Sequence, residues 1–290
     1  MLGKSGRESG AHARLAAELG NWSANDNDLL DLGAQSVMLA TIAEIDGISA
    51  VVHIGHPAQP LPELERLLLS APGTLMLTSA VAVESQWTLV YRGKEHSGVV
   101  IVDEAGMRDT RYALRSLGLT PHVVQTPMSI EARVELAGEF DALVVERDQI
   151  PAGYVAHPDS DRLKELPVIW YGLLETVSEL PQFQDPAQVW LAFGPEQDHR
   201  GSLQSILQVF ADHNVDLQHL RSQRSTESSH VFLSSFGLDG AQSLRNLVTD
   251  LESRGVQNRI LAIFDGQHFV PGPDALEPVW SRQLSAEQSA

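Results

Sequence analysis

The sequence contains no cysteine among its 290 residues. This absence excludes disulfide bonds, thiolate nucleophiles, and zinc or iron–sulfur sites with cysteine ligands. It favours a cytoplasmic protein over a secreted one. The length favours about two domains of roughly 100–200 residues each.

Basic residues are scarce, with 20 Lys and Arg against 38 Asp and Glu and a formal net charge of −18. This balance repels nucleic-acid backbones and anionic lipids, and no local basic patch interrupts it. We therefore expect no nucleic-acid partner and no membrane partner. A small anionic ligand would need arginines gathered at one site.

Long hydrophobic runs are absent as well. The longest uncharged stretch, residues 67–83, is shorter than a typical membrane span and is interrupted by Pro72 and Gly73. Residues 1–8 are polar and lack the apolar segment of a signal peptide. The sequence therefore predicts a soluble protein.

The first 175 residues show α/β alternation. Short apolar runs rich in β-forming residues occur at 48–54, 75–83, 87–91, 99–102, 122–124 and 142–145. Helical patterns lie between several of them, at 61–68, 108–117 and 128–137. The alternation predicts a mixed or parallel sheet flanked by helices, with ligands at the carboxyl ends of the strands.

The remaining chain has a different pattern. Residues 175–186 lose periodicity and have the composition of a linker. Beyond them the spacing of apolar residues predicts a strand at 189–193, a helix at 203–210, strands at 217–224 and 230–236, a helix at 244–251 and a strand at 259–264. This βαββαβ order predicts a ferredoxin-like unit.

Two segments of that unit carry further information. The first helix opens with Gly201, Ser202 and Leu203, and residues 221–224 read RSQR, with Ser222. These segments resemble the ACT domain attached to prephenate dehydratase, which has a Gly-Ala-Leu turn and a Glu-Ser-Arg-Pro segment at these places. The resemblance implies phenylalanine as an effector at these four residues, because glycine lets backbone amides approach a ligand and the helix start attracts a carboxylate. The alternative is a unit that serves only for dimerisation.

Four N-terminal segments extend the resemblance. They read LGKSGRES at 2–9, VHIGHP at 52–57, DEAGMR at 103–108 and TPMS at 126–129. In order and spacing they resemble the GPKGTFSE, VPIENS and SHPQAL segments and the serine-threonine-rich helix start of prephenate dehydratases. Only Met1 and Leu2 precede Gly3, so either the first strand is abbreviated or the chain start is trimmed. The resemblance implies a two-lobed, periplasmic-binding-protein-like domain at 1–175, a linker at 176–186, an ACT-like regulatory domain at 187–273 and a tail at 274–290.

The largest departure from the family is at residues 167–172, which read PVIWYG where dehydratases carry Thr-Arg-Phe. Without the catalytic threonine, the acid that protonates the 4-hydroxyl of prephenate as it leaves in dehydratases is missing. Prephenate decarboxylases of antibiotic pathways are similar, since they also have an apolar, tryptophan-containing segment here and protonate a ring carbon instead. Asp103 and Glu104 replace a Ser-His pair and bring negative charge towards a dianion, which argues for a changed substrate or an inactive site.

The candidate binding residues follow from this resemblance and from charge. Prephenate is a dianion, so arginines at the glycine loop and at the edge of the second lobe are candidates, and serines at two helix starts either bind a carboxylate or cap their helices. Together with the tryptophan of the altered segment, they are Arg7, Ser9, Arg108, Arg111, Ser129 and Trp170.

Three residues are candidate proton donors or acceptors. His53 and His56 lie in the loop that contacts substrate in the family, and Tyr171 has the only hydroxyl of the altered segment. The His-x-x-His spacing is weak evidence for metal, and we expect no metal ion and no organic cofactor, because the electronics of the substrate drive decarboxylation.

Two functions remain open at this point. The first is a lyase that acts on prephenate or a close relative, with decarboxylation favoured over dehydration, in a phenylalanine-related or specialised-metabolite pathway. The second is a catalytically silent protein that binds an aromatic amino acid or regulates a partner. Both imply a homodimer formed through the ACT-like unit.

Overall fold

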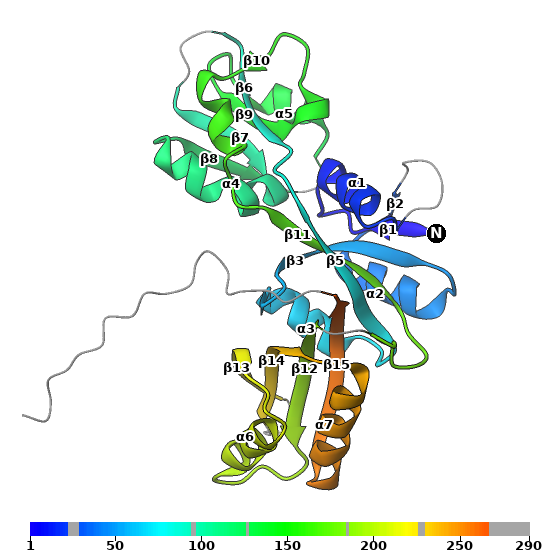
Figure 1. The fold of residues 1–290 in the computed structure, drawn as a ribbon. Helices are drawn as coiled ribbons and strands as arrows, with labels where there is room; N and C mark the ends of the chain where they lie inside the picture. Colours follow the sequence, from blue (N-terminus) through cyan, green and yellow to red (C-terminus); the bar gives the residue numbers. More distant parts are fainter. Residues whose placement is uncertain (23–28, 94–96, 126–127, 184–185, 226–229, 267–290) are drawn as a thin grey trace, which may run out of the picture.

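The computed structural model describes residues 1–22, 29–93, 97–125, 128–183, 186–225 and 230–266. Three α/β units lie in a row along an elongated molecule, and the first unit along the chain lies between the other two (Figure 1). The predicted tail at 274–290 and the end of the predicted 187–273 unit lie outside the described residues. No helix in the described ranges is both long and apolar enough to cross a lipid bilayer.

The first unit is built on one part of a ten-stranded sheet, in the order β5-β11-β3-β1-β2. β1 runs parallel to β2 and β3, whereas β11 runs antiparallel to β3 and β5. Its elements are β1 (Leu2–Lys4), α1 (Gly10–Leu19), β2 (Leu30–Asp31), α2 (Gln35–Glu44), β3 (Ser49–His56), β4 (Gln59–Pro60), α3 (Pro62–Ser70), β5 (Leu75–Val83) and β11 (Ile169–Thr176).

The second unit has its own five-stranded sheet, in the order β10-β6-β9-β7-β8. The chain enters it through residues 84–86 and returns to the first unit through residues 164–168 (Figure 1). Its elements are β6 (Trp87–Tyr91), β7 (Val99–Asp103), α4 (Glu104–Ser116), β8 (Thr120–Val124), α5 (Ile130–Leu136), β9 (Ala142–Glu146), η1 (Arg147–Gln149), β10 (Val155–Ala156) and η2 (Pro158–Leu163).

The C-terminal unit has the predicted βαββαβ order, with its strands arranged β13-β14-β12-β15. β15 runs parallel to β5 at Ala262 and Leu77, so the sheet continues into the first unit. Its elements are β12 (Ala187–Pro195), α6 (Ser202–Asp212), β13 (Leu217–Arg224), β14 (His230–Leu238), α7 (Ala241–Ser253) and β15 (Val256–Asp265).

Two hydrophobic cores join the units. One combines Trp190 and Phe264 of the C-terminal unit with Leu68 and Leu77 of the first unit. The other combines Trp87 and Leu114 of the second unit with residues of α1, β3 and β11. The first unit is thus packed on both sides.

Local capping explains where some elements depart from the predicted ones. α4 begins four residues earlier than the apolar spacing indicates, because the Asp103 carboxylate accepts a hydrogen bond from the Gly106 amide at 2.7 Å. Within the segment 167–172, residues 169–172 form the start of strand β11, in which Gly172 packs closely against Ile54 and Leu77.

Candidate functional site

The candidate site lies where β3 and β11 meet α1 and the second unit. Tyr171 of β11 is paired in register with His53 of β3, and their rings are 5.6 Å apart. The His12 ring of α1 lies 6.4 Å from the Tyr171 ring and 5.2 Å from the Trp87 ring of the second unit. Rings from both units therefore form one ring cluster: His12, His53, Trp87 and Tyr171.

A charged group lies beside this ring cluster. Arg108 of α4 donates from Nε to Asp109 Oδ1 at 2.8 Å and from Nη1 to Glu8 Oε2 at 3.3 Å. The second Asp109 oxygen accepts from Trp87 Nε1 at 3.0 Å. Burial opposes charge on Arg108, but Glu8 and Asp109 raise its pKa well above the usual value. Since Glu8 belongs to the first unit, this ion pair bridges the two units.

His12 is held in one tautomer by its partners. The Gln86 amide donates to His12 Nε2 at 2.8 Å, and a backbone N–H can only donate, so the neutral ring carries its proton on Nδ1. Nδ1 donates to Ser9 Oγ at 2.5 Å, and Ser9 Oγ donates to Glu146 Oε1 at 2.6 Å. Burial lowers the pKa of His12 to about 4, which agrees with the neutral form.

This chain of hydrogen bonds has a chemical consequence. His12 donates to Ser9 rather than accepting its proton, so the pair lacks the geometry of a serine nucleophile activated by histidine. Ser9 also caps α1, because its Oγ accepts from the His12 amide at 3.2 Å. Ser9 therefore joins α1 to the second unit through Glu146.

Polar atoms of the ring cluster lack hydrogen-bond partners. The Tyr171 hydroxyl and His53 Nδ1 are buried and have no partner among the described residues. Burial raises the pKa of Tyr171 well above its usual value and lowers the pKa of His53 to about 3. At neutral pH Tyr171 is therefore a protonated donor and His53 is uncharged. Buried polar atoms without partners are costly, so these two are candidate contacts for a ligand.

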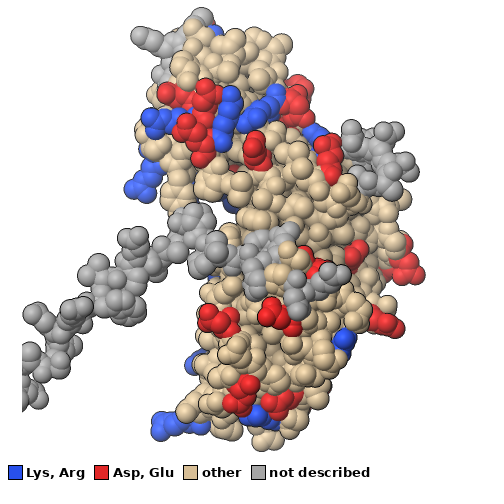
Figure 2. Space-filling view, in the orientation of Figure 1, with Lys and Arg blue, Asp and Glu red and all other residues tan. Residues whose placement is uncertain are grey.

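The arginines predicted from sequence are placed differently from one another. Arg108 lies at the ring cluster. Arg7 is exposed, with its Nε 3.8 Å from Glu104, and Arg111 is exposed with its guanidinium over the Tyr112 ring. Figure 2 shows basic and acidic side chains interspersed on this face of the second unit, in keeping with such pairs.

Trp170 and His56 lie on the other face of the first unit, because side chains alternate along β11. Trp170 packs against the core shared with the C-terminal unit, and its ring is 6.1 Å from the His56 ring. His56 Nδ1 accepts from the Ala58 amide at 3.1 Å, and burial lowers the pKa of His56. The structure therefore separates this pair from Tyr171 and His53.

The remaining N-terminal candidates have local partners. Ser129 caps α5 by accepting from the Ala132 amide at 3.2 Å. Asp103, expected to repel an anion, pairs with buried Arg133 at 3.1 Å. The negative charges anticipated at 103 and 104 are thus compensated by arginines.

Several residues of the site were not identified from sequence: Glu8, His12, Trp87, Asp109 and Glu146. The Ser9-x-x-His12 spacing places a cap and its N3 residue in one helical turn, which is a local signal for their contact. The other contacts join residues far apart in the chain and carry no such signal.

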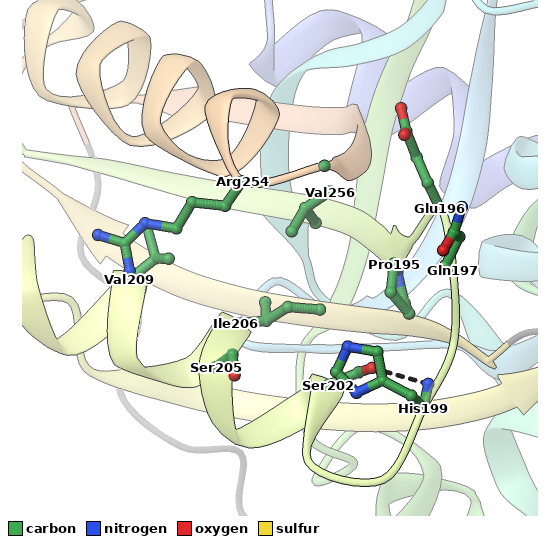
Figure 3. A pocket seen from close by; sticks show the side chains of 11 residues that line it. Pro195, Glu196, Gln197, His199, Ser202, Ser205, Ile206, Val209, Arg254 and Val256 are labelled. Atoms are coloured by element: carbon green, nitrogen blue, oxygen red, sulfur yellow. Dashed lines mark hydrogen bonds between the residues drawn. The ribbon is translucent and has the colours of Figure 1, made fainter.

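A hollow lies in the C-terminal unit, with a volume of about 420 Å³ (Figure 3). Its lining includes Ser202, which accepts from the His199 amide at 2.9 Å, together with Ile206 and Arg254. Of the other predicted effector residues, Gly201 has φ +97°, Leu203 packs into the core and Ser222 lies exposed on β13. Ser202 is thus the predicted effector residue that lines the hollow.

Within the described ranges there is no group of three or more His, Asp or Glu side chains that could hold a metal ion.

Comparisons with known proteins show similarity in structure. No family model and no curated protein matches the sequence. The prephenate dehydratase of Arthrobacter aurescens in complex with L-Phe has a TM-score of 0.70 at 14% identity, over 94% of this chain and 93% of that chain. The fold is shared with prephenate dehydratases.

Two further solved structures have similar extents. The prephenate dehydratase of Staphylococcus aureus subsp. aureus Mu50 has a TM-score of 0.63 at 14% identity, over 91% of this chain and 100% of that chain. GqqA, described as a novel type of quorum-quenching acylase, has a TM-score of 0.61 at 18% identity, over 92% of this chain and 98% of that chain. At these identities the likeness concerns the fold alone, because one fold hosts different chemistries.

Proposed function

We propose that this protein is a prephenate dehydratase-like lyase that acts on prephenate or a close relative at the ring cluster, in a phenylalanine-related or specialised-metabolite pathway. The first two units are then two lobes of one catalytic domain at 1–175. The observation that carries the proposal is the buried, protonated and unpartnered Tyr171 hydroxyl, on the face that also holds His53 and Arg108.

In the proposed reaction Tyr171 donates one proton to the substrate. The bond between the ring carbon and its carboxylate breaks, carbon dioxide leaves, and the electron pair enters the ring. In decarboxylation alone the proton goes to a ring carbon, whereas in dehydration it goes to the 4-hydroxyl, which leaves as water. Arg108 stabilises the resulting phenolate, which recovers its proton from water as the product leaves, and His53 Nδ1 holds the substrate hydroxyl. We favour decarboxylation, because no threonine stands at 168–170.

The test is incubation of the purified protein with prephenate at neutral pH, with products separated by mass and ultraviolet absorbance and a protein-free control subtracted. A non-aromatic keto acid lighter by carbon dioxide alone supports the proposal. Phenylpyruvate at high rate would instead assign dehydration.

A matched pair of variants tests the role of Tyr171. Y171F should lose most turnover. Y154F should retain it, because the Tyr154 hydroxyl is also buried and unpartnered among the described residues but packs in a different core of the second unit. Equal activity in both variants would remove Tyr171 from the reaction.

A second candidate function is a catalytically silent protein that binds an aromatic amino acid or regulates a partner. It is favoured by the pairing of Arg108 with two carboxylates and by the hollow at Ser202. The βαββαβ unit is then an ACT-like regulatory domain and a dimer interface, as the likeness to a dehydratase in complex with L-Phe supports. Absence of prephenate consumption together with phenylalanine binding by calorimetry would select this function, and light scattering would measure the dimer.

A further inference from the structure

The charged groups beside the ring cluster include more carboxylates than guanidinium groups. The Glu8 and Asp109 side chains, with exposed fractions of 3% and 4%, both contact the single guanidinium of Arg108. A third buried carboxylate, Glu146, accepts the hydrogen bond of Ser9. The other guanidinium nearby, that of Arg147, donates to the Ser85 carbonyl at 2.8 Å. Three carboxylates therefore lie near the ring cluster, against the two guanidinium groups of Arg108 and Arg147.

The remaining polar groups add no positive charge. His12 and His53 are neutral at pH 7 because burial lowers the pKa of each. The Tyr171 hydroxyl is neutral and lies in the negative field of Glu8, Asp109 and Glu146. The site therefore offers neutral hydrogen-bonding atoms and one guanidinium that its own carboxylates already engage.

Glu8 is the carboxylate whose removal alters this balance most simply. It precedes the cap Ser9 and reaches Arg108 from the opposite unit, whereas Asp109 also accepts from Trp87 and Glu146 also accepts from Ser9 and the Ala11 amide. A ligand carboxylate that approaches Arg108 Nη1 meets Glu8 at the same position. Like charges at one guanidinium disfavour binding, and desolvation strengthens the effect.

We propose that Glu8 sets the charge of the ligand, so that the site takes a cyclic acid with a single carboxylate in preference to a dianion. This inference rests on the proposed function, since it states which close relative of prephenate the ring cluster accepts. Specificity then comes from repulsion of the doubly charged acid as well as from contacts to the ring.

The test compares two probes by titration calorimetry at neutral pH: phenylpyruvate, with one carboxylate, and prephenate, with two. Wild type should bind phenylpyruvate about tenfold more tightly, the ratio expected from one unfavourable charge contact of modest size. E8Q keeps the shape and an acceptor oxygen for Arg108 but removes the charge. It should bind both acids more tightly than wild type does, and prephenate by the larger factor, about tenfold, because prephenate carries two charges, so the ratio between the two acids should fall.

The matched control is E104Q, which removes the carboxylate of the exposed pair with Arg7 and should leave the wild-type ratio unchanged. If E8Q fails to fold, D109N removes a carboxylate from the same guanidinium and should shift the ratio in the same direction.

The inference is overturned if wild type prefers prephenate, if E8Q leaves the ratio unchanged, or if neither probe binds either protein. Its failure is distinct from that of the proposed function, because binding is measured without turnover. Wild type that turns over prephenate and prefers it retains the function and loses the inference. The expected ratios without turnover of any cyclohexadienyl acid do the reverse.

Discussion

The first unit contacts its two neighbours through interfaces of different character. On the C-terminal side, two neutral donors meet carbonyls: Trp190 Nε1 donates to Pro57 O at 2.6 Å, and Ser235 Oγ donates to Ala58 O at 2.5 Å. Arg221 of β13 also pairs there with the buried Glu65 carboxylate of α3. On the side of the second unit, the Tyr171 hydroxyl and His53 Nδ1 have no partner among the described residues, and Arg108 faces carboxylates.

Arg259 and Arg108, one at each interface, have different kinds of partner. Arg259 donates to the carbonyls of Ala71 and Pro72, both at 2.7 Å, and burial lowers its pKa. Arg108 has carboxylate partners, which raise its pKa against the effect of burial. Arg259 Nε is buried without a partner among the described residues, as are the Tyr171 hydroxyl and His53 Nδ1 beside Arg108, so the contrast lies in the two carboxylates that share the Arg108 guanidinium. The interface at Arg108, where two such atoms lie on neighbouring rings, is the candidate for ligand binding.

The largest effect is expected at the interface between the first unit and the C-terminal unit. W190A should lower the free energy of unfolding by about 3–5 kcal/mol, because it removes a buried indole and leaves the Pro57 carbonyl without this donor. Urea unfolding measures the change. F140A, at an aromatic residue exposed in the second unit, serves as the control and should have a small effect. Similar losses in both variants would contradict the assignment.

The next largest effect is a loss of stability at acidic pH that depends on His12. The unfolded chain takes up a proton near pH 6.5, but folded His12 does so only near pH 4, so the free energy of unfolding should decrease as pH falls through this window. The pKa difference of His12 between the two states should lower the free energy of unfolding by roughly 3 kcal/mol between pH 7 and pH 4. Urea unfolding at several pH values should show a flatter dependence for H12Q than for wild type or for H122Q, which alters an exposed histidine. An unchanged slope in H12Q would refute it.

A smaller effect is expected at Arg259, which contacts the first unit from β15. R259M should cost about 1–3 kcal/mol, because the Ala71 and Pro72 carbonyls lose a donor. R254M removes an exposed arginine that pairs with Asp212 and Asp250, and it should change stability by about 0.5 kcal/mol or less. Thermal and urea unfolding measure both variants, and equal effects would show that Arg259 contributes no more than a surface ion pair.

The smallest effect is expected at Tyr171. Y171F should leave stability unchanged or raise it by about 1 kcal/mol or less, because it removes a buried hydroxyl that has no partner among the described residues. A loss of stability measured by urea unfolding would show that the hydroxyl does have a structural partner. Unchanged stability with lost turnover would sharpen the contrast between the two interfaces.

Much of the fold was accessible from sequence. The strands predicted at 75–83, 87–91 and 217–224 coincide with β5, β6 and β13, because hydrophobic alternation is a local property. The helix at 203–210 is contained in α6 for the same reason. The resemblance in motif order agrees with the fold shared with prephenate dehydratases.

The site was accessible only in part. Tyr171, His53, Ser9 and Arg108 were named from the sequence and lie at or beside the ring cluster. Trp170 and His56 are also sequence candidates, but they lie on the other face, because neighbouring side chains along β11 point to opposite faces of the sheet. Glu8 and Glu146 were missed because their partners are distant in the chain.

The sequence by itself determined the order and type of the main elements at 48–145 and in the C-terminal unit, the absence of cysteine chemistry and the excess of acid, because these depend on composition and on spacing within a few turns. Only the tertiary structure decided which polar atoms are paired. Glu8 meets Arg108 across 100 residues and Ser9 meets Glu146 across 137. Such contacts depend on how two units pack, and that packing leaves the Tyr171 hydroxyl buried and without a described partner.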